Sequence, residues 1–559
     1  MLWKDDNRCP GPAHMAGPHH LMEGVLQNMS SMSDETYAIF LDSEEEIRWT
    51  WHDLQSHSNT VMGSLEGLDR GVVLIFLRDM REMHSAFFGS MMAGLIPSFM
   101  PCSSPKQDPD IYWSSHSRLL SRIKPKAILT SPDVHIEMRD AGLDLNGVKV
   151  LYIEQMGPKE NQSSATILNS DEIALLQHSS GTTGLKKGVA LSHRAVALHA
   201  ERYGNSIEAT REDVIASWLP LYHDMGLMAC MLMPAYLGIP ILQMDPFKWV
   251  ADPSRFLSKI EEYEATLIWM PNFAFELYSR LEPVFRKKSD LSSIRMAISC
   301  SEICKAETLD KFCQLYAGWG LKKSAFQVCY AMAETVFATS HTSNDGLVNR
   351  ISVNPDSINE GDSIEIVNDG NVIISCGKSI EGLHLSIHDE DGDRVEDGVI
   401  GEIGVSGDYL FDGYFLLEDL TSSRFVNGTF MTRDMGFMLQ DELYVLGRKD
   451  DMIIVQGRNI YAHEIETLLL DVEGLKPGRS VAFGVSDEVS GSEALVVMCE
   501  YAEKGGRVDD IKKNIRTIIE SSLGVVPKKV EIVDLGWLIK TSSGKIDRKK
   551  NKQKFMRGG

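Results

Sequence analysis

Hydrophobic and polar residues follow one pattern up to about residue 450 and another beyond it. Residues 71–105 begin with GVVLIFL, continue with apolar side chains at helical spacing and end in a second apolar run at 96–100. This order predicts a strand, an amphipathic helix and a second strand. Similar alternation recurs through residues 211–340, so we predict an α/β protein whose large N-terminal domain has mostly parallel sheets flanked by helices.

Beyond Asp451 the apolar runs are shorter. MIIV, SVAFGV, ALVVMCEY and KVEIV predict strands, and residues 462–470 and 511–522 predict helices between them. The pattern indicates a small C-terminal α+β domain of about 100 residues. The basic tail KKNKQKFMRGG is interpreted as a solvated or frayed end rather than a binding arm.

Length and composition support more than one packed unit. A chain of 559 residues is too long for one hydrophobic core, and its 43% hydrophobic and 24% charged residues are typical of a soluble globular protein. The most apolar stretch, residues 228–244, contains two prolines and is shorter than the roughly 20 residues of a membrane span, so we predict core and no membrane span. The N-terminus has acids and prolines where a signal peptide needs an apolar run, and we expect a cytoplasmic protein.

Cysteine usage and charge exclude further classes. Nine cysteines without CxxC pairs indicate reduced thiols, so we expect no disulfide framework and no structural metal. The net charge of −23 argues against nucleic acid as a partner, because such binding needs Lys and Arg to neutralise phosphates. From Asp451 to the end, however, 18 Lys and Arg stand against 16 Asp and Glu. The charge therefore changes where the hydrophobic pattern changes.

A loop rich in glycine and hydroxyl groups is the first candidate for chemistry. SSGTTGLKKG follows an apolar segment and precedes a helix predicted to begin near Ser192. Glycines and small hydroxylated residues let backbone N–H groups approach an anion, and Lys187 adds positive charge. The order of residues differs from that of a Walker A loop. The segment is either a polyphosphate-binding loop or a surface turn.

This loop resembles the phosphate-loop signature of the adenylate-forming superfamily, which includes acyl-CoA synthetases, peptide-synthetase adenylation domains and firefly luciferase. Only the proline of the signature is missing, replaced by Lys186. The resemblance implies that the loop binds ATP and that Thr183 is catalytic. The ATP-binding residues that it implies here are Ser179, Ser180, Gly181, Thr182, Thr183, Gly184 and Lys187.

Further motifs follow in the order of that family. QVCYAMAE resembles its Tyr-Gly-x-Thr/Ala-Glu motif, with alanine in place of glycine. The resemblance implies that Tyr330 stacks on adenine beside Ala331, and that Glu334 is catalytic and holds magnesium. SCSEI is similar to the family's adenine-contacting loop, which implies nucleotide contacts from Ser301 and Glu302.

Three motifs near the C-terminus complete the series. TRD stands where the family has Thr-Gly-Asp, which implies that Asp434 accepts hydrogen bonds from the ribose hydroxyls, although Arg433 replaces the glycine. GRKDD is similar to the hinge motif, which implies that Arg448 contacts ribose or phosphate and that Asp450 is the pivot. KTSSGKIDR resembles the last motif, which implies that Lys545 is the catalytic lysine and also binds the nucleotide.

Within the superfamily the chain resembles the fatty acyl-AMP ligases. SWLPLYHDMGL and PNFAFELY are similar to their motifs, which implies a catalytic His223 at the floor of the acyl and adenylate pocket. The spacing after Glu334 is longer than in ordinary acyl-CoA synthetases, and residues 348–371 are interpreted as the insertion typical of acyl-AMP ligases. In that group the insertion is associated with poor use of CoA.

The resemblance implies an AMP-binding domain at residues 1–447, a hinge at 448–450 and a C-terminal domain at 451–559. It also implies the activity: MgATP converts a carboxylic acid, by default a fatty acid, into acyl-AMP, and the acyl group passes to the phosphopantetheine thiol of an acyl carrier protein. An acyl-CoA ligase that uses free CoA is the nearest alternative. A non-catalytic acyl- or nucleotide-binding homologue is the alternative of another class.

Overall fold

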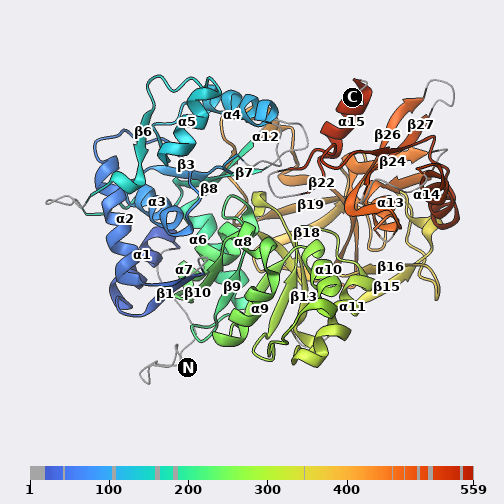
Figure 1. The fold of residues 1–559 in the computed structure, drawn as a ribbon, viewed down its shortest axis with the longest axis horizontal. Helices are drawn as coiled ribbons and strands as arrows, with labels where there is room; N and C mark the ends of the chain where they lie inside the picture. The colour runs from blue at the N-terminus through green and yellow to red at the C-terminus, as the bar shows by residue number, and fades with distance from the viewer. Residues whose placement is uncertain are drawn as a thin grey trace.

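The computed structural model describes residues 19–41, 45–103, 109–157, 164–179, 187–344, 347–455, 458–470, 472–487, 492–501, 508–541 and 545–557. The chain forms a large α/β domain followed by a small α+β domain, which confirms the predicted fold class. Figure 1 shows the small domain, in orange and red, at one end of the long axis of the molecule.

A nine-stranded sheet is the centre of the large domain. From β13 to β1 all neighbouring strands are parallel, and the strands beyond them at both edges are antiparallel. The carboxyl ends of parallel strands meet at one edge, where ligands of open α/β sheets bind. The strands in spatial order are β17 (Lys378–Ser379), β14 (Ala338–His341), β13 (Phe326–Ala331), β12 (Met296–Ser299), β11 (Leu267–Met270), β9 (Ile215–Ser217), β10 (Ile241–Met244), β1 (Thr36–Leu41) and β2 (Glu46–Thr50).

A second sheet is parallel throughout and contains the unit predicted at residues 71–105. That unit folds as β3 (Val72–Phe76), α3 (Met80–Met92) and β4 (Ile96–Phe99), which confirms the prediction. The side chain of Asp79 starts α3 by accepting hydrogen bonds from the backbone N–H groups of Arg81 and Glu82. The spatial order is β4, β3, β5 (Ala127–Thr130) and β6 (Lys149–Tyr152).

Three smaller sheets complete the large domain, and helices cover its sheets (Figure 1). The strands are β7 (Ile173–Ser179), β8 (Lys187–Ser192) and β20 (Gly413–Tyr414); β18 (Leu383–His388), β19 (Gly401–Gly407), β21 (Phe425–Val426), β22 (Thr429–Leu439) and β23 (Glu442–Arg448); and the pair β15 (Arg350–Val353) and β16 (Asn371–Ile374). The helices are α1 (Leu21–Ser31), α2 (Trp51–Leu65), α4 (Pro109–Ile123), α5 (Pro132–Asp140), α6 (His193–Ser206), α7 (Met233–Leu237), α8 (Pro246–Ala251), α9 (Pro253–Glu262), α10 (Asn272–Leu281), α11 (Ala306–Tyr316) and α12 (Glu418–Ser422).

The most apolar stretch of the sequence is core, as predicted. Met225–Leu232 forms a π-helix that runs into α7, and every residue of both is buried. Among the described residues, no helix is both long enough and apolar enough to cross a membrane.

The small domain has a hydrophobic core of its own, formed by residues such as Ile465, Val497 and Ile515. The strands and helices predicted beyond Asp451 are confirmed, and β25 is an addition. They are β24 (Met452–Val455), β25 (Arg458–Tyr461), α13 (Ala462–Leu468), β26 (Leu475–Asp487), β27 (Ser492–Tyr501), α14 (Val508–Leu523) and β28 (Lys529–Val533).

The interpretation of the basic tail as a frayed end is wrong. The tail forms α15 (Arg548–Met556), which the side chain of Asp547 caps. Asn551 is fully buried and exchanges hydrogen bonds with the backbone of Ile539. The ring of Phe555 packs on Phe483 with centroids 5.6 Å apart. These two contacts fix a helix whose other residues are mostly charged.

Candidate functional site

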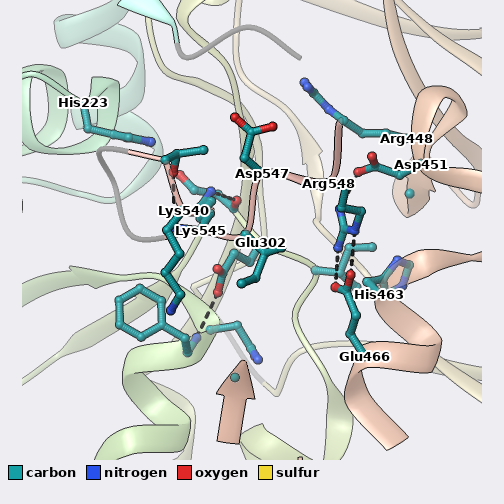
Figure 2. Close-up of a pocket in the computed structure, with 18 of the residues that line it drawn as sticks. His223, Glu302, Arg448, Asp451, His463, Glu466, Lys540, Lys545, Asp547 and Arg548 are labelled. Carbon is teal, nitrogen blue, oxygen red and sulfur yellow. Dashed lines mark hydrogen bonds and ion pairs between the residues drawn. The ribbon is translucent and has the colours of Figure 1, made fainter. Parts of the chain in front are cut away.

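A cavity of about 2080 Å³ lies between the two domains. It is lined by residues from the carboxyl edge of the central sheet, from β22 and β23, and from the small domain (Figure 2). The sequence-predicted residues among its lining are Lys187, His223, Ser301, Glu302, Tyr330, Ala331, Glu334, Asp434, Arg448, Asp450 and Lys545. The fold therefore brings these residues together, while their individual roles stay predictions.

The phosphate-loop prediction falls mostly on undescribed positions. Ser180, Gly181, Thr182, Thr183 and Gly184 lie outside the described residues. The side chain of Ser179 is also outside the description, although its backbone belongs to β7.

The two ends of that loop are held together by backbone pairing. Ser179 pairs with Lys187 at the end of the antiparallel strands β7 and β8. The helix predicted after the loop is α6, and the side chain of Ser192 caps its first turn. Lys187, at one described end of this segment, lines the cavity.

Lys187 is a buried cation with a neighbouring cation. Its ammonium lies 4.9 Å from the centre of the Tyr414 ring. Burial lowers the pKa of Lys187, and the charge of Arg424 lowers it further, while Glu334 acts in the opposite direction. An anion such as a polyphosphate would stabilise both cations. Arg424 also lines the cavity, and sequence reasoning missed it because it belongs to no motif.

Glu334 is oriented by a tyrosine. The hydroxyl of Tyr414 donates a 2.7 Å hydrogen bond to Oε1 of Glu334. Burial, together with the charge of Glu334, raises the pKa of Tyr414, so this hydroxyl keeps its proton. Tyr414 was not predicted to be a site residue.

The carboxylate of Glu334 fits the magnesium ion that accompanies ATP. Among the described residues, no group of three or more His, Cys, Asp and Glu side chains could hold a metal ion. Mg²⁺ commonly uses one or two protein carboxylates and takes its other ligands from phosphates and water. Glu334 would hold the ion, and the ion would supply positive charge to the phosphates.

Asp434 is the centre of a second polar cluster that lines the cavity. Its Oδ2 accepts a 2.6 Å hydrogen bond from the Tyr330 hydroxyl, and its Oδ1 accepts a 3.0 Å bond from Nε of Arg448. The charge of Asp434 raises the pKa of Arg448, which secures its positive charge. Because each carboxylate oxygen has two lone pairs, Asp434 can still accept hydrogen bonds from hydroxyl groups.

Lys545 crosses from the small domain to the large one. Its Nζ donates a 2.5 Å hydrogen bond to the backbone carbonyl of Ser301, which adopts a left-handed conformation with φ 66°. The backbone of Lys545 is held by Thr541, which accepts its N–H and donates to its carbonyl. Next to Ser301, Oε2 of Glu302 accepts a 2.9 Å bond from the N–H of Phe273.

His223 is fixed by its neighbour in the chain. Nδ1 of His223 lies 2.6 Å from Oδ1 of Asp224, which also caps the π-helix through the N–H of Met225. Burial acts to raise the pKa of Asp224, but the charge and hydrogen bond of His223 outweigh it and the pKa is lowered. The charge of Lys545 also lowers the pKa of Asp224. The two candidate catalytic residues, His223 and Lys545, are therefore close to each other (Figure 2).

Another part of the cavity wall is aromatic. The rings of Trp218 and Trp249 are parallel, with centroids 3.5 Å apart, and Phe273 meets both edge-on. Nε1 of Trp249 donates to the hydroxyl of Tyr278, which fixes the ring. The two tryptophans were not predicted as site residues, although Trp218 lies within the motif SWLPLYHDMGL that contains His223.

The chain is similar to known proteins in both sequence and fold. The family model described as AMP-binding enzyme matches residues 27–415. The medium-chain-fatty-acid–(acyl-carrier-protein) ligase JamA of Moorena producens is 28% identical over 94% of this chain and 93% of its own length. The putative fatty-acid–CoA ligase FadD21 of Mycobacterium tuberculosis is 29% identical over 83% of this chain and 84% of its own. A solved structure from a study of fatty acyl-adenylate ligases from E. coli and L. pneumophila has a TM-score of 0.87 and 25% identity, over 98% of this chain and 99% of that one.

Proposed function

Since the chain belongs to the AMP-binding enzyme family and is an ATP-dependent, AMP-forming ligase, we propose that it activates a fatty acid as acyl-AMP and transfers the acyl group to the phosphopantetheine thiol of an acyl carrier protein. A carrier-protein ligase among the relatives supports the acceptor. The apolar wall of Trp218 and Trp249 beside the polar half of the cavity supports an acid with a hydrocarbon part.

Adenylate formation has an electrostatic difficulty. A carboxylate is already ionised at neutral pH, so no general base is needed. Two anions must meet in line, while charge develops on the departing pyrophosphate, and preorganised positive groups supply most of the acceleration. Lys187 and Lys545 provide such groups from opposite domains, and Glu334 would hold the magnesium that accompanies ATP.

One contact carries this proposal. Nζ of Lys545 reaches the carbonyl of Ser301 at 2.5 Å and so lies in the same cavity as Lys187 and Glu334. A lysine on an independent small domain has no structural need to cross into the large domain. Its position supports a role at the reacting carboxylate, with His223 as part of the same pocket.

Transfer to a thiol requires the same carbonyl to be approached from another side. In this proposal Lys545 would stand beside that carbonyl during adenylation, so the small domain would have to rotate before the thiol can enter. We propose that the domains at residues 1–447 and 451–559 move relative to each other about a hinge at 448–450, because the two domains have separate hydrophobic cores.

Residues 348–371 support a carrier protein over free CoA as the acceptor. They include β15 and the connection to its antiparallel partner β16, and Ile358 and Ile364 pack in one cluster with Tyr461 of the small domain. A segment that contacts both domains is suited to influence which acceptor enters between them. Because the relative FadD21 is named as a CoA ligase, free CoA is included as the alternative acceptor in the test below.

We propose a cytoplasmic location for the reaction, because it consumes ATP and because the cysteines of the described residues are free thiols. The acyl carrier protein and the fatty acid are the proposed partners. The phosphopantetheine is part of the carrier protein, so we expect it to enter the site only together with that protein.

Mass spectrometry tests the proposed function directly. The purified protein is incubated with ATP, magnesium and a panel of fatty acids, with free CoA in one arm and a phosphopantetheinylated carrier protein in another. We expect an acyl-adenylate that persists with CoA and is consumed by the carrier. Acyl-CoA as the main product would identify a CoA ligase, and the absence of any adenylate would contradict the proposed activity.

A further inference from the structure

The short segment that joins the domains is anchored by a series of ion pairs. Arg448 pairs with Asp434, and Lys449 pairs with Glu360 at 2.7 Å, so both are fixed to the large domain. Two positions after Lys449, Asp451 pairs with Arg548 of the small domain at 2.6 Å. The chain therefore changes its attachment from one domain to the other near Asp450.

Asp450 itself is held by the large domain through Arg433. Nη2 of Arg433 lies 2.5 Å from Oδ1 of Asp450, and both side chains are a little over one third exposed. Burial acts to raise the pKa of Asp450, but the hydrogen bond and charge of Arg433 outweigh it and lower the pKa. The pair is therefore ionised on both sides at neutral pH.

The backbone of Arg433 is unusual for an arginine. Its φ of 67° lies in the left-handed region, which residues with a Cβ adopt at a cost. The N–H of Arg433 donates a 2.8 Å hydrogen bond to Oε1 of Glu402, which holds the strained residue in place. The chain thus keeps a long charged side chain at a position whose backbone favours glycine, and the contact with Asp450 is what that side chain provides.

We infer that Arg433 is a positioning residue that anchors Asp450 to the large domain and thereby favours the orientation in which Lys545 enters the cavity. Arg433 makes no step of the reaction itself. The inference rests on the proposed function, because it assigns the two domain orientations to the two half-reactions. Breaking the ion pair should favour the orientation for thiol transfer at the expense of adenylate formation.

The test compares Arg433→Gln with Arg433→Lys, since both keep a side chain on the left-handed backbone and only the second keeps the charge. Adenylation is followed by pyrophosphate release, and transfer by single turnover of preformed acyl-AMP with a phosphopantetheinylated carrier protein as the acceptor. Partly exposed ion pairs shift an equilibrium by up to about fivefold, so Arg433→Gln should raise the ratio of transfer to adenylation by up to about that factor. Arg433→Lys should stay close to the wild type.

Hydrogen–deuterium exchange of residues 447–453 provides a readout that needs no catalysis. Arg433→Gln and Asp450→Asn should each increase exchange there, and the double variant should add little to either single one. Unchanged exchange and an unchanged ratio in Arg433→Gln would overturn the inference. If no protein in the series forms acyl-adenylate, the proposed function fails, and the exchange data still decide whether Arg433 anchors the hinge.

Discussion

At the scale of single residues, Tyr414 connects the two charges that adenylation needs. Its hydroxyl donates to Glu334, and its ring lies under the ammonium of Lys187. Neither contact is local in the sequence, since 80 positions separate Tyr414 from Glu334. The hydroxyl should therefore matter for the use of MgATP more than for folding.

Tyr414→Phe removes the hydrogen bond to Glu334 and keeps the ring. A hydrogen bond to a charged group contributes roughly 1.5–3 kcal/mol, so kcat/KM for MgATP should fall by about 10-fold or more. Tyr409→Phe is the matched control, because the Tyr409 hydroxyl donates to the carbonyl of Glu381. Equal loss of activity in both variants would show that Tyr414 acts through stability rather than through Glu334.

Glu82 on α3 gives a prediction for pH dependence. Burial, followed by the charges of Asp79 and Glu154, raises the pKa of Glu82 from 4.5 to about 7. A raised carboxyl pKa means that ionisation opposes folding, so this contribution to stability is complete below pH 4.5 and is lost as the pH rises through 7. Glu82 is only partly buried, and the loss should be discounted to about 1 kcal/mol.

Thermal unfolding between pH 5 and 8 checks this contribution. Glu82→Gln should be about 1 kcal/mol more stable than the wild type at pH 8 and nearly equal to it at pH 5. The exposed Glu212→Gln serves as the control and should follow the wild type at every pH. A difference between Glu82→Gln and the wild type that does not change with pH would contradict the assigned pKa.

Many residues of the site could be predicted from the sequence, because the family motifs have a fixed order along the chain. Lys187, Glu334, Asp434 and Lys545 were all predicted and all line one cavity. Arg424, Trp218 and Trp249 were not, because their position at the cavity depends on how distant strands and helices pack. A spacing pattern carries no information on such contacts.

At the scale of elements, α15 connects the stability of the small domain to the position of Lys545. Asn551 on this helix accepts from the N–H of Ile539 and donates to the carbonyls of Ile539 and Asp547. Residues 539–541 lead directly into the loop of Lys545, and Lys540 pairs with Ile546 across it. The buried side chain of Asn551 therefore supports the base of that loop.

Asn551→Ala leaves the N–H of Ile539 without its partner, while the carbonyls of Ile539 and Asp547 keep the backbone N–H groups of Asp547 and Asn551. A lost bond of this kind costs about 1–3 kcal/mol when no water replaces it, so we expect the small domain to lose about that much stability and adenylation to fall with it. Gln553→Ala, on the exposed face of the same helix, should change stability by less than about 0.5 kcal/mol. Urea unfolding of both variants measures the difference, and equal stability would remove the support assigned to Asn551.

Elements with strong apolar periodicity were predictable, and α15 was not. α3 and α14 bury a regular apolar face, which the sequence displays directly. α15 has almost no apolar face, and its two anchoring residues, Asn551 and Phe555, find their partners only in the folded domain. For this reason, the charged sequence of α15 was interpreted as a solvated tail.

At the scale of the whole molecule, the two domains have separate cores and are joined by one short segment. Two polar contacts, Lys545 with Ser301 and Lys305 with Thr467, hold them in the observed orientation together with a small apolar cluster that includes Tyr461 of the small domain. Polar contacts and a small cluster break more readily than an extended apolar interface, which is what a protein with two alternating arrangements requires. The central claim is that this orientation serves adenylate formation alone.

The most direct test measures the two half-reactions of Lys545→Ala separately. Adenylation is followed by pyrophosphate release, and transfer by supplying preformed acyl-AMP and a phosphopantetheinylated carrier protein. The account predicts a loss of adenylation by about 100-fold or more, because a cation at the reacting centre is removed, with transfer within about twofold of the wild type. Equal loss of both half-reactions would contradict it, since Lys545 would then act in both domain orientations or in folding.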